Sequence, residues 1–430
     1  MTDEYFTTRP HIEQAVYKTQ TVRAYQNNPT IEALPLILSQ AEAIRQLTWH
    51  VDYQPEDRLA PMNERIHMVR AASQFFHPSF MHVELEQRAS RMLRQGYLGQ
   101  RNAFSEYYHR DLNHRISAMD LNQERRDDRR FFGQGSLMAG ISGIGKSTAF
   151  QRIFSLYPQV IDHTNYKGTP FSKRQVVSLI LQCPHDSSTR GLCRQFLVQM
   201  GKLVGKNYEE LYAKPRESVD DLLRSMTRVA ELHSLGVLVI DEIQVLNQAK
   251  SGGREQMLNF FLQLVNEIGL PVVLIGTYQA YQLFDNNLRL GRRGTGEGTL
   301  DWDRMQPTGD WDEFVEALWR YQYLRRRVEL SKDLNRELYE QSQGITDLAV
   351  KLYIFAQIRA ITTAATPDEE VLTCATIRSV AADSFSAVMP VLAKLRTGDP
   401  NVIKTIEDVC RPSLDQFIVE SRRAARKAGR

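Results

Sequence analysis

The segment from Gly140 to Ser147, GISGIGKS, fits the pattern G-x-x-x-x-G-K-[ST], and few sequence features restrict a fold so strongly. Apolar residues, Leu137 to Ala139, precede it, and helix-compatible residues follow from Thr148. The glycines let the backbone wrap phosphate groups, the lysine bridges the terminal phosphates, and the serine hydroxyl ligates Mg²⁺. The residues predicted to bind ATP and Mg²⁺ are Ser142, Gly143, Ile144, Gly145, Lys146, Ser147 and Thr148.

A second motif, Gly236 to Glu242, reads GVLVIDE and is typical of a buried parallel strand that ends in two carboxylates. Asp241 and Ser147 are the two residues predicted to bind Mg²⁺. Glu242 is the predicted catalytic residue that orients and polarises the attacking water. A solvated strand end would also explain the two carboxylates alone. Their combination with the phosphate loop favours hydrolysis over phosphotransfer.

Further candidates follow along the chain. Thr277 comes directly after the apolar stretch Val272 to Gly276, so its hydroxyl is expected between the two motifs, although a simple turn is the alternative. Arg292 and Arg293 lie on the basic, glycine-rich segment RLGRRGTGEG and are candidate arginine fingers for a neighbouring subunit. DNA contact or solubility would also account for them. Lys351 stands where a lid-helix residue that contacts nucleotide is expected, although arginine is usual there.

Apolar strand-like stretches alternate with helical patterns from Ser136 to Ile275, which predicts a parallel sheet with crossover helices. Past Asp310 the pattern is helical to about Ala365. We therefore expect the α/β class, with a parallel sheet flanked by helices, a helical lid, and extensions at both ends. The phosphate loop and the run ending in Asp241 and Glu242 resemble those of AAA+ proteins, which implies an AAA+ P-loop core. The predicted boundaries are 1–60 for an N-terminal partner-binding extension, 61–308 for the core with its upstream helices, 309–365 for the lid, and 366–430 for a C-terminal extension with a basic tail.

Composition indicates the cellular compartment of the protein but says little about its function. The 54 basic and 51 acidic residues give a net charge of +3, too close to balance to indicate a polyanionic partner. The four cysteines have no paired CxxC spacing, and no apolar run approaches the roughly 18 residues that cross a bilayer. We expect a soluble, cytoplasmic protein that does not enter a membrane. Cys183, His185 and Cys193 invite a zinc interpretation, but no fourth ligand has suitable spacing, so buried thiols are favoured.

Taken in order, these motifs resemble the TnsC/TniB family of AAA+ regulators of DNA transposition. Three looser stretches add to the resemblance: Phe76 to Pro78 with Gly96-Tyr97 and Arg101-Asn102, Gln182 to Cys193, and Trp302 to Trp311. The resemblance spans about residues 64 to 360. The first 60 and the last 65 or so residues carry no short motif that matches it.

The resemblance implies an ATP-dependent homo-oligomer, ring or filament, that assembles on double-stranded DNA. It also implies two protein partners, TnsA/TnsB-like transposase subunits and a TnsD/TniQ-like target selector, with ATP hydrolysis controlling disassembly. Such proteins grip the DNA backbone without reading bases. Candidate DNA contacts are Lys173, Arg174, Arg190 and Arg194, although each is also compatible with solvated surface.

Two other functions remain open at this point. One is an initiator or loader-type AAA+ ATPase of DNA replication, which the upstream Phe76 to Pro78 and Gly96-Tyr97 stretches disfavour. The other is a nucleotide-gated binding module with negligible hydrolysis, which Glu242 disfavours.

Overall fold

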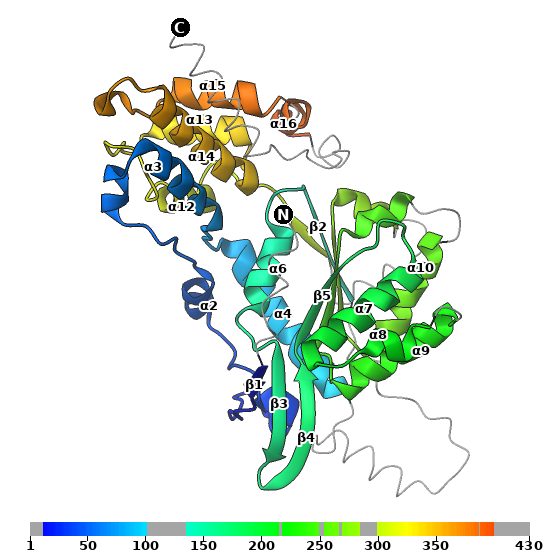
Figure 1. Ribbon diagram of the computed structural model, residues 1–430. Coiled ribbons are helices and arrows are strands. Elements are labelled where there is room, and N and C mark those ends of the chain that lie inside the picture. The colour runs from blue at the N-terminus through cyan, green and yellow to red at the C-terminus, as the bar shows by residue number, and fades with distance from the viewer. Residues whose placement is uncertain are drawn as a thin grey trace, which may run out of the picture. The chain divides into compact units, whose positions relative to one another are not determined.

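The computed structural model describes residues 12–100, 135–214, 217–248, 253–265, 269–283, 299–386 and 388–399 (Figure 1). These residues divide into two compact units. The sheet unit takes the described residues within 1–39, 84–139 and 147–301. The helical unit takes those within 40–83, 140–146 and 302–430.

A five-stranded sheet organises the sheet unit. Its strands, in spatial order, are β5 (Ser178–Gln182), β6 (Val237–Asp241), β7 (Val272–Gly276), β2 (Gly135–Gly140) and β8 (Thr299–Trp302). The pairs β5–β6, β6–β7 and β7–β2 are parallel. The predicted α/β class with a parallel sheet is confirmed.

Helices cover both faces of this sheet, which is why its central strands β6 and β7 are buried along their whole length and almost entirely apolar. On one face, Phe196 of α7 (Thr189–Val204), Met226 of α9 (Val219–Leu232) and Phe261 of α10 (Gly253–Gln263) pack with alternate strand residues such as Leu238 and Leu274. Burying a side chain of this size contributes roughly 1.5–3 kcal/mol. Continuous strand runs without polar alternation follow from this double burial.

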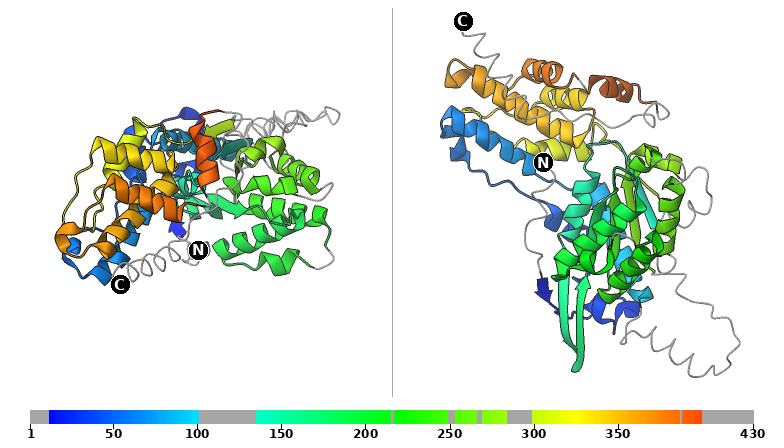
Figure 2. Two further views of the ribbon diagram at one scale, coloured as in Figure 1. Left: turned by 90° about the horizontal axis from the view of Figure 1, so that it is seen from above. Right: turned by 45° about the vertical axis from the view of Figure 1, so that its right-hand side comes forward.

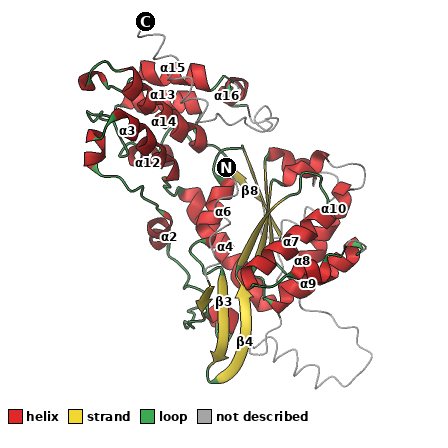
Figure 3. Ribbon diagram, viewed as in Figure 1, coloured by secondary structure: helices red, strands yellow, loops and turns green. Residues whose placement is uncertain are grey.

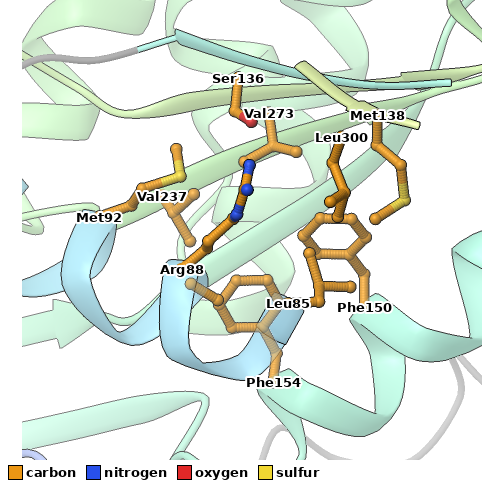
Figure 4. Close-up of a pocket in the computed structure, with 11 residues that line it drawn as sticks. Leu85, Arg88, Met92, Ser136, Met138, Phe150, Phe154, Val237, Val273 and Leu300 are labelled. Atoms are coloured by element: carbon orange, nitrogen blue, oxygen red, sulfur yellow. The ribbon is translucent and has the colours of Figure 1, made fainter. Parts of the chain in front are cut away.

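Helices α4 (Phe80–Gly99) and α6 (Lys146–Phe154) cover the other face. Figure 4 shows a small pocket there, lined by Leu85, Arg88, Ala89, Met92, Ser136, Met138, Phe150, Phe154, Val237, Val273 and Leu300. Most of its lining is apolar, and the Arg88 guanidinium is paired with Glu84 at 2.8 Å. This face is therefore a packing interface and not a phosphate site.

Two glycines allow α4 to approach the sheet closely. A Cβ on Gly96 would lie 2.6 Å from Pro271 Cγ, and a Cβ on Gly236 would lie 2.3 Å from Leu93 Cδ1. Tyr97 is fully buried beside them. The Gly96-Tyr97 stretch that contributed to the family resemblance therefore has a packing role in this chain.

The structure contains a protruding β-hairpin that the sequence patterns did not predict. Strands β3 (Val160–Tyr166) and β4 (Thr169–Val176) pair antiparallel and extend away from the main sheet, and the short β1 (Ile12–Gln14) pairs with β3 in parallel (Figure 3). The apolar run from Val176 to Gln182 belongs to two strands, because β4 ends at Val176 and β5 begins at Ser178. The hairpin was missed because its residues are largely polar and give no clear two-residue period.

The helical unit contains the predicted helical segment beyond Asp310. Its helices are α2 (Gln40–Leu47), α3 (Met62–Met68), α12 (Asp310–Leu318), α13 (Lys332–Ser342), α14 (Thr346–Thr363), α15 (Cys374–Ser384) and α16 (Met389–Arg396), with short 3₁₀ turns at η3 (Pro55–Leu59), η4 (Val69–Gln74) and η9 (Pro367–Glu369) (Figure 2). None of the described helices in either unit is both long and apolar enough to cross a membrane.

Helix α14 is the centre of this unit, since most of its side chains are buried and α13, α15, α3 and η4 all pack on it. The predicted domain boundary at residue 61 stays a prediction. Within residues 61–83, α3 and η4 contact α14. The apolar side chains of Ile66, Val69 and Ala72 are buried in the helical unit.

His82 makes the helical unit sensitive to acid. Its ring lies edge-on to Phe76 and Trp302, each with a centroid distance of 4.8 Å, and its Nδ1 accepts the Ser79 N–H at 3.0 Å. Burial lowers the pKa of His82 from 6.5 to about 3. Between these two pH values the imidazole is protonated in the unfolded chain and neutral in the folded chain. Stability is therefore full above pH 6.5 and falls as the pH drops, by about 1.4 kcal/mol per pH unit.

We expect His82→Asn, which keeps an acceptor for Ser79, to flatten this pH dependence between pH 6.5 and 4.5 while lowering stability at pH 7.5. All four tryptophans, Trp49, Trp302, Trp311 and Trp319, lie in the helical unit, so their fluorescence during urea unfolding reports on it. The exposed His67→Asn is the matched control. Equal pH slopes for wild type and His82→Asn would contradict the assignment.

Candidate nucleotide site

The carboxyl edge of the parallel sheet collects the polar residues of the site. Strand β7 lies between β6 and β2, and the chain continues from β2 into the phosphate loop. Asp241 ends β6, and Thr277 follows β7 directly. The strand order therefore places Thr277 on the edge next to Asp241 and Glu242.

Asp241 is oriented by two hydrogen bonds. The Ser147 hydroxyl, at the start of α6, donates to Asp241 Oδ2. The backbone N–H of Glu242 donates to Oδ1 at 2.8 Å. The side chain is buried, so its negative charge acts in a region with little water. Ser147 and Asp241, far apart in sequence, thus meet as the pair that would hold Mg²⁺, whose preferred ligands are oxygens.

Glu242 has a left-handed backbone, with φ of 59°. This conformation is uncommon for a residue other than glycine, and it recurs at functional sites where surrounding structure imposes it. The amide of Gln244 donates a hydrogen bond to Glu242 Oε2. The sequence-based prediction did not include Gln244, although its place two residues after the carboxylate was visible.

Thr277 provides a test of whether the site fits a ligand. Its side chain is 6% exposed, and its Oγ1 is a buried atom with no hydrogen-bond partner among the described residues. A buried hydroxyl without a partner costs roughly 1–3 kcal/mol, which a bound phosphate oxygen or water would offset. The site therefore fits an oxygen-rich ligand at this edge.

Within the helical unit, the phosphate loop has the backbone that its motif predicts. Gly143 and Gly145 have φ values of 84° and 96°, which only glycine adopts readily. The Lys146 Nζ donates to the carbonyl oxygens of Gly140, at 2.9 Å, and Ile141, at 2.8 Å. These two carbonyl oxygens are neutral acceptors, and a phosphate would offer charged ones. Of the other predicted binding residues, Ser142 and Ile144 are buried, and Thr148 is exposed.

Lys351 contacts Asp347, which is itself hydrogen-bonded to the phosphate loop. Its Nζ pairs with Asp347 Oδ2 at 2.7 Å, and the Asp347 N–H donates to the Gly143 carbonyl at 3.1 Å. The Thr346 hydroxyl donates to the same carbonyl at 3.3 Å. The start of α14 is therefore attached to the phosphate loop, and Lys351 is linked to the loop through Asp347.

The remaining candidates have other surroundings. Arg292 and Arg293 lie outside the described residues. Arg174 pairs with Asp162 at 2.6 Å, Arg194 pairs with Glu209 at 2.8 Å, and Arg190 donates to the Glu217 carbonyl. Burial lowers the pKa of Lys173, while nearby Glu231 acts in the opposite direction. The three arginines therefore have partners within the chain, and Lys173 is partly buried.

The two cysteines of the zinc interpretation are buried thiols. Burial raises the pKa of Cys183 and of Cys193 to about 12, which disfavours the thiolate that zinc requires. Across the described ranges, no group of three or more His, Cys, Asp or Glu side chains is arranged to hold a metal by itself.

One family model matches part of this chain. A family model described as an AAA domain matches residues 132–284. That range includes the phosphate loop, Asp241, Glu242 and Thr277. No curated protein sequence matches the chain.

Three of the similar solved structures share 11–15% sequence identity with this chain. The Walker-type ATPase PABY2304 of Pyrococcus abyssi has 13% identity and a TM-score of 0.39, over 62% of this chain and 71% of its own. Cdc6p from Pyrobaculum aerophilum has 15% identity and a TM-score of 0.36, over 70% and 82%. The Aeropyrum pernix ORC2 protein has 11% identity and a TM-score of 0.38, over 77% and 87%. Similarity at this level carries no functional conclusion. The matched model and the edge geometry agree: this chain is an ATPase, and its residues 132–284 are similar to an AAA domain.

Proposed function

We propose that this chain is an AAA+ regulator of DNA transposition, which assembles on double-stranded DNA with ATP bound and is released after hydrolysis. The observation that carries the ATP-dependent part is the sheet edge formed by half-buried Ser147 and Glu242 and by buried Asp241 and Thr277. The Thr277 hydroxyl has no hydrogen-bond partner among the described residues. The motif resemblance to TnsC/TniB regulators supports the transposition part.

Each residue has a distinct chemical task in this proposal. The loop amides and Lys146 bind the phosphates of ATP, and Ser147 and Asp241 hold Mg²⁺. Glu242 polarises the attacking water, and the Thr277 hydroxyl fixes that water or the terminal phosphate. Lys351 reaches the nucleotide once its pairing with Asp347 is exchanged for a phosphate. Arg292 or Arg293 acts on the ATP of a neighbouring subunit in the ring or filament.

The proposal also assigns partners. Double-stranded DNA is gripped through its backbone by Lys173, Arg174, Arg190 and Arg194, so that binding weakens steeply with salt. The pairing of Arg174 with Asp162 and of Arg194 with Glu209 means that DNA would have to exchange these contacts. Residues 1–60 and 366–430 would meet the TnsD/TniQ-like selector and the TnsA/TnsB-like transposase subunits.

An initiator or loader-type ATPase of DNA replication is the alternative, and DNA sequence preference separates the two. A regulator that reads no bases binds unrelated duplexes with affinities within a few-fold of each other, whereas specific proteins favour their sites by about 10³-fold or more. The decisive experiment is electron microscopy of the protein with unrelated duplexes, with and without a non-hydrolysable ATP analogue. Rings or filaments that require both ligands and no particular sequence support the proposal; a monomer indifferent to DNA would overturn it.

Lys146→Ala is expected to weaken ATP binding roughly 10- to 100-fold, because a charge-assisted hydrogen bond contributes about 1.5–3 kcal/mol. Assembly on DNA at moderate ATP should then be lost. Isothermal titration with the ATP analogue measures the first effect, and sedimentation with duplex DNA measures the second. Lys202→Ala, on an exposed part of α7, is the matched control. Unchanged ATP affinity in Lys146→Ala would contradict the phosphate-binding role.

A further inference from the structure

Gln244 connects the two catalytic candidates of the sheet edge. It lies on η6 (Ile243–Gln248), two residues after Glu242. Its Oε1 accepts the backbone N–H of Thr277 at 3.1 Å, and its Nε2 donates to Glu242 Oε2. One side chain therefore spans from the end of β6 to the end of β7.

Donor and acceptor chemistry fixes which way this amide faces. The Thr277 N–H can only donate, so it must meet the amide oxygen of Gln244. The amide nitrogen then faces the Glu242 carboxylate, which only accepts when it is ionised. If the amide were reversed, its nitrogen would face the Thr277 N–H, donor against donor, and its oxygen would face the Glu242 carboxylate, acceptor against acceptor. Glutamine at position 244 is thus matched to both partners at once.

Gly276 leaves the room that Gln244 occupies. A Cβ at position 276 would lie 2.8 Å from Gln244 Oε1 and 2.8 Å from Ile243 Cγ2, closer than real Cβ contacts. Any larger residue before Thr277 would displace the amide. Gly276, Thr277, Gln244 and Glu242 therefore form a single connected arrangement.

We propose that Gln244 is a positioning residue, which holds the Glu242 carboxylate in the orientation that polarises water and keeps it in register with Thr277. The backbone of Glu242 is set by its left-handed φ of 59°, and Gln244 sets the other end of the side chain. A misplacement of about 1 Å at a reacting group can cost on the order of 10²-fold in rate. This inference rests on the proposed ATP hydrolysis at this edge.

The first test is Gln244→Met, which keeps the length of the side chain and removes both hydrogen bonds. We expect kcat for ATP hydrolysis to fall roughly 10- to 100-fold, with the Kd for the ATP analogue changed less than about threefold. Gly276→Ala should give the same pattern, because its Cβ displaces the amide. A kcat within twofold of wild type, or a raised kcat, in Gln244→Met would overturn the positioning role.

The second test is the pH profile of Gln244→Glu, which a merely structural role would not move. At pH 8 two carboxylates face each other, and kcat should fall at least as far as in Gln244→Met. As the pH is lowered toward 5.5, the pair takes up one shared proton, since neighbouring carboxylates raise each other's apparent pKa. The protonated group donates to Glu242 as the amide does, so kcat relative to wild type should recover.

Gln46→Glu, on the exposed surface of α2, is the matched control and should follow wild type at every pH. Circular dichroism at each pH confirms that the variants are folded. A ratio of Gln244→Glu to wild type that stays flat from pH 8 to 5.5 would overturn the inference while leaving ATP turnover by the wild type intact. Loss of DNA-dependent assembly would instead count against the transposition proposal alone. Absence of turnover in the wild type would overturn both.

Discussion

Glu242→Gln is expected to lower kcat for ATP hydrolysis by about 10²- to 10⁴-fold, the usual contribution of a positioned general base. ATP binding should be nearly unchanged, because the phosphate loop and the pair of Ser147 and Asp241 stay intact. Glutamine at this position still offers an oxygen to the Gln244 amide, so the local structure should persist. The variant should therefore remain assembled on DNA in the presence of ATP.

Phosphate release measures the rate, and electron microscopy over time measures persistence on DNA. The control is Glu255→Gln, an exposed carboxylate on α10, which should turn over ATP at the wild-type rate. Normal turnover by Glu242→Gln would remove Glu242 from its assigned role. Slow turnover combined with rapid release from DNA would separate hydrolysis from disassembly and count against the proposed cycle.

The core of this site could be predicted because its residues are set by local patterns. The phosphate loop and the run Gly236 to Glu242 are each contiguous, and apolar strands before them indicate a parallel sheet. Parallel strands end at one edge, so two motifs far apart in sequence converge there. The hydrogen bond between Ser147 and Asp241 is a direct consequence of that rule.

Other contacts depend on tertiary register, which no local pattern reports. Gln244 meets Thr277 only because β6 and β7 are neighbours and Gly276 leaves space. Lys351 pairs with Asp347, as their spacing of four residues on α14 allows, and its contact with nucleotide stays a prediction. The hairpin of β3 and β4 is held by side chains such as His163, whose Nε2 meets Gln175 Oε1 at 2.7 Å.

A buried ion pair unites two distant segments of the helical unit. Arg65 of α3 and Glu370 make two hydrogen bonds, of 2.6 and 2.7 Å, and their side chains are only 2% and 6% exposed. Arg65 also donates to the Tyr323 carbonyl at 2.8 Å, and the Arg325 N–H donates to Glu370 at 2.8 Å. The pair is thus fully hydrogen-bonded, which is the condition under which buried charges are tolerated.

Removing one partner should destabilise the helical unit by about 3–5 kcal/mol, because the other charge is left buried without compensation. We expect this loss for Arg65→Met and a loss of similar size for Glu370→Met. The double variant should cost less than the sum of the two, since no unpaired charge remains. Tryptophan fluorescence during urea unfolding isolates this unit, because all four tryptophans lie in it.

The neighbouring surface pair provides the matched comparison. Arg326 and Asp368 lie 3.8 Å apart with side chains 71% and 84% exposed, and an exposed pair contributes about 0–1 kcal/mol. Arg326→Met should therefore shift the unfolding midpoint little, although it removes the same type of charge a few residues from Tyr323. If Arg65→Met cost no more than Arg326→Met, the ion pair could not be what unites α3 with the segment after α14. Packing of Ile66 and Val69 alone would then have to account for that attachment.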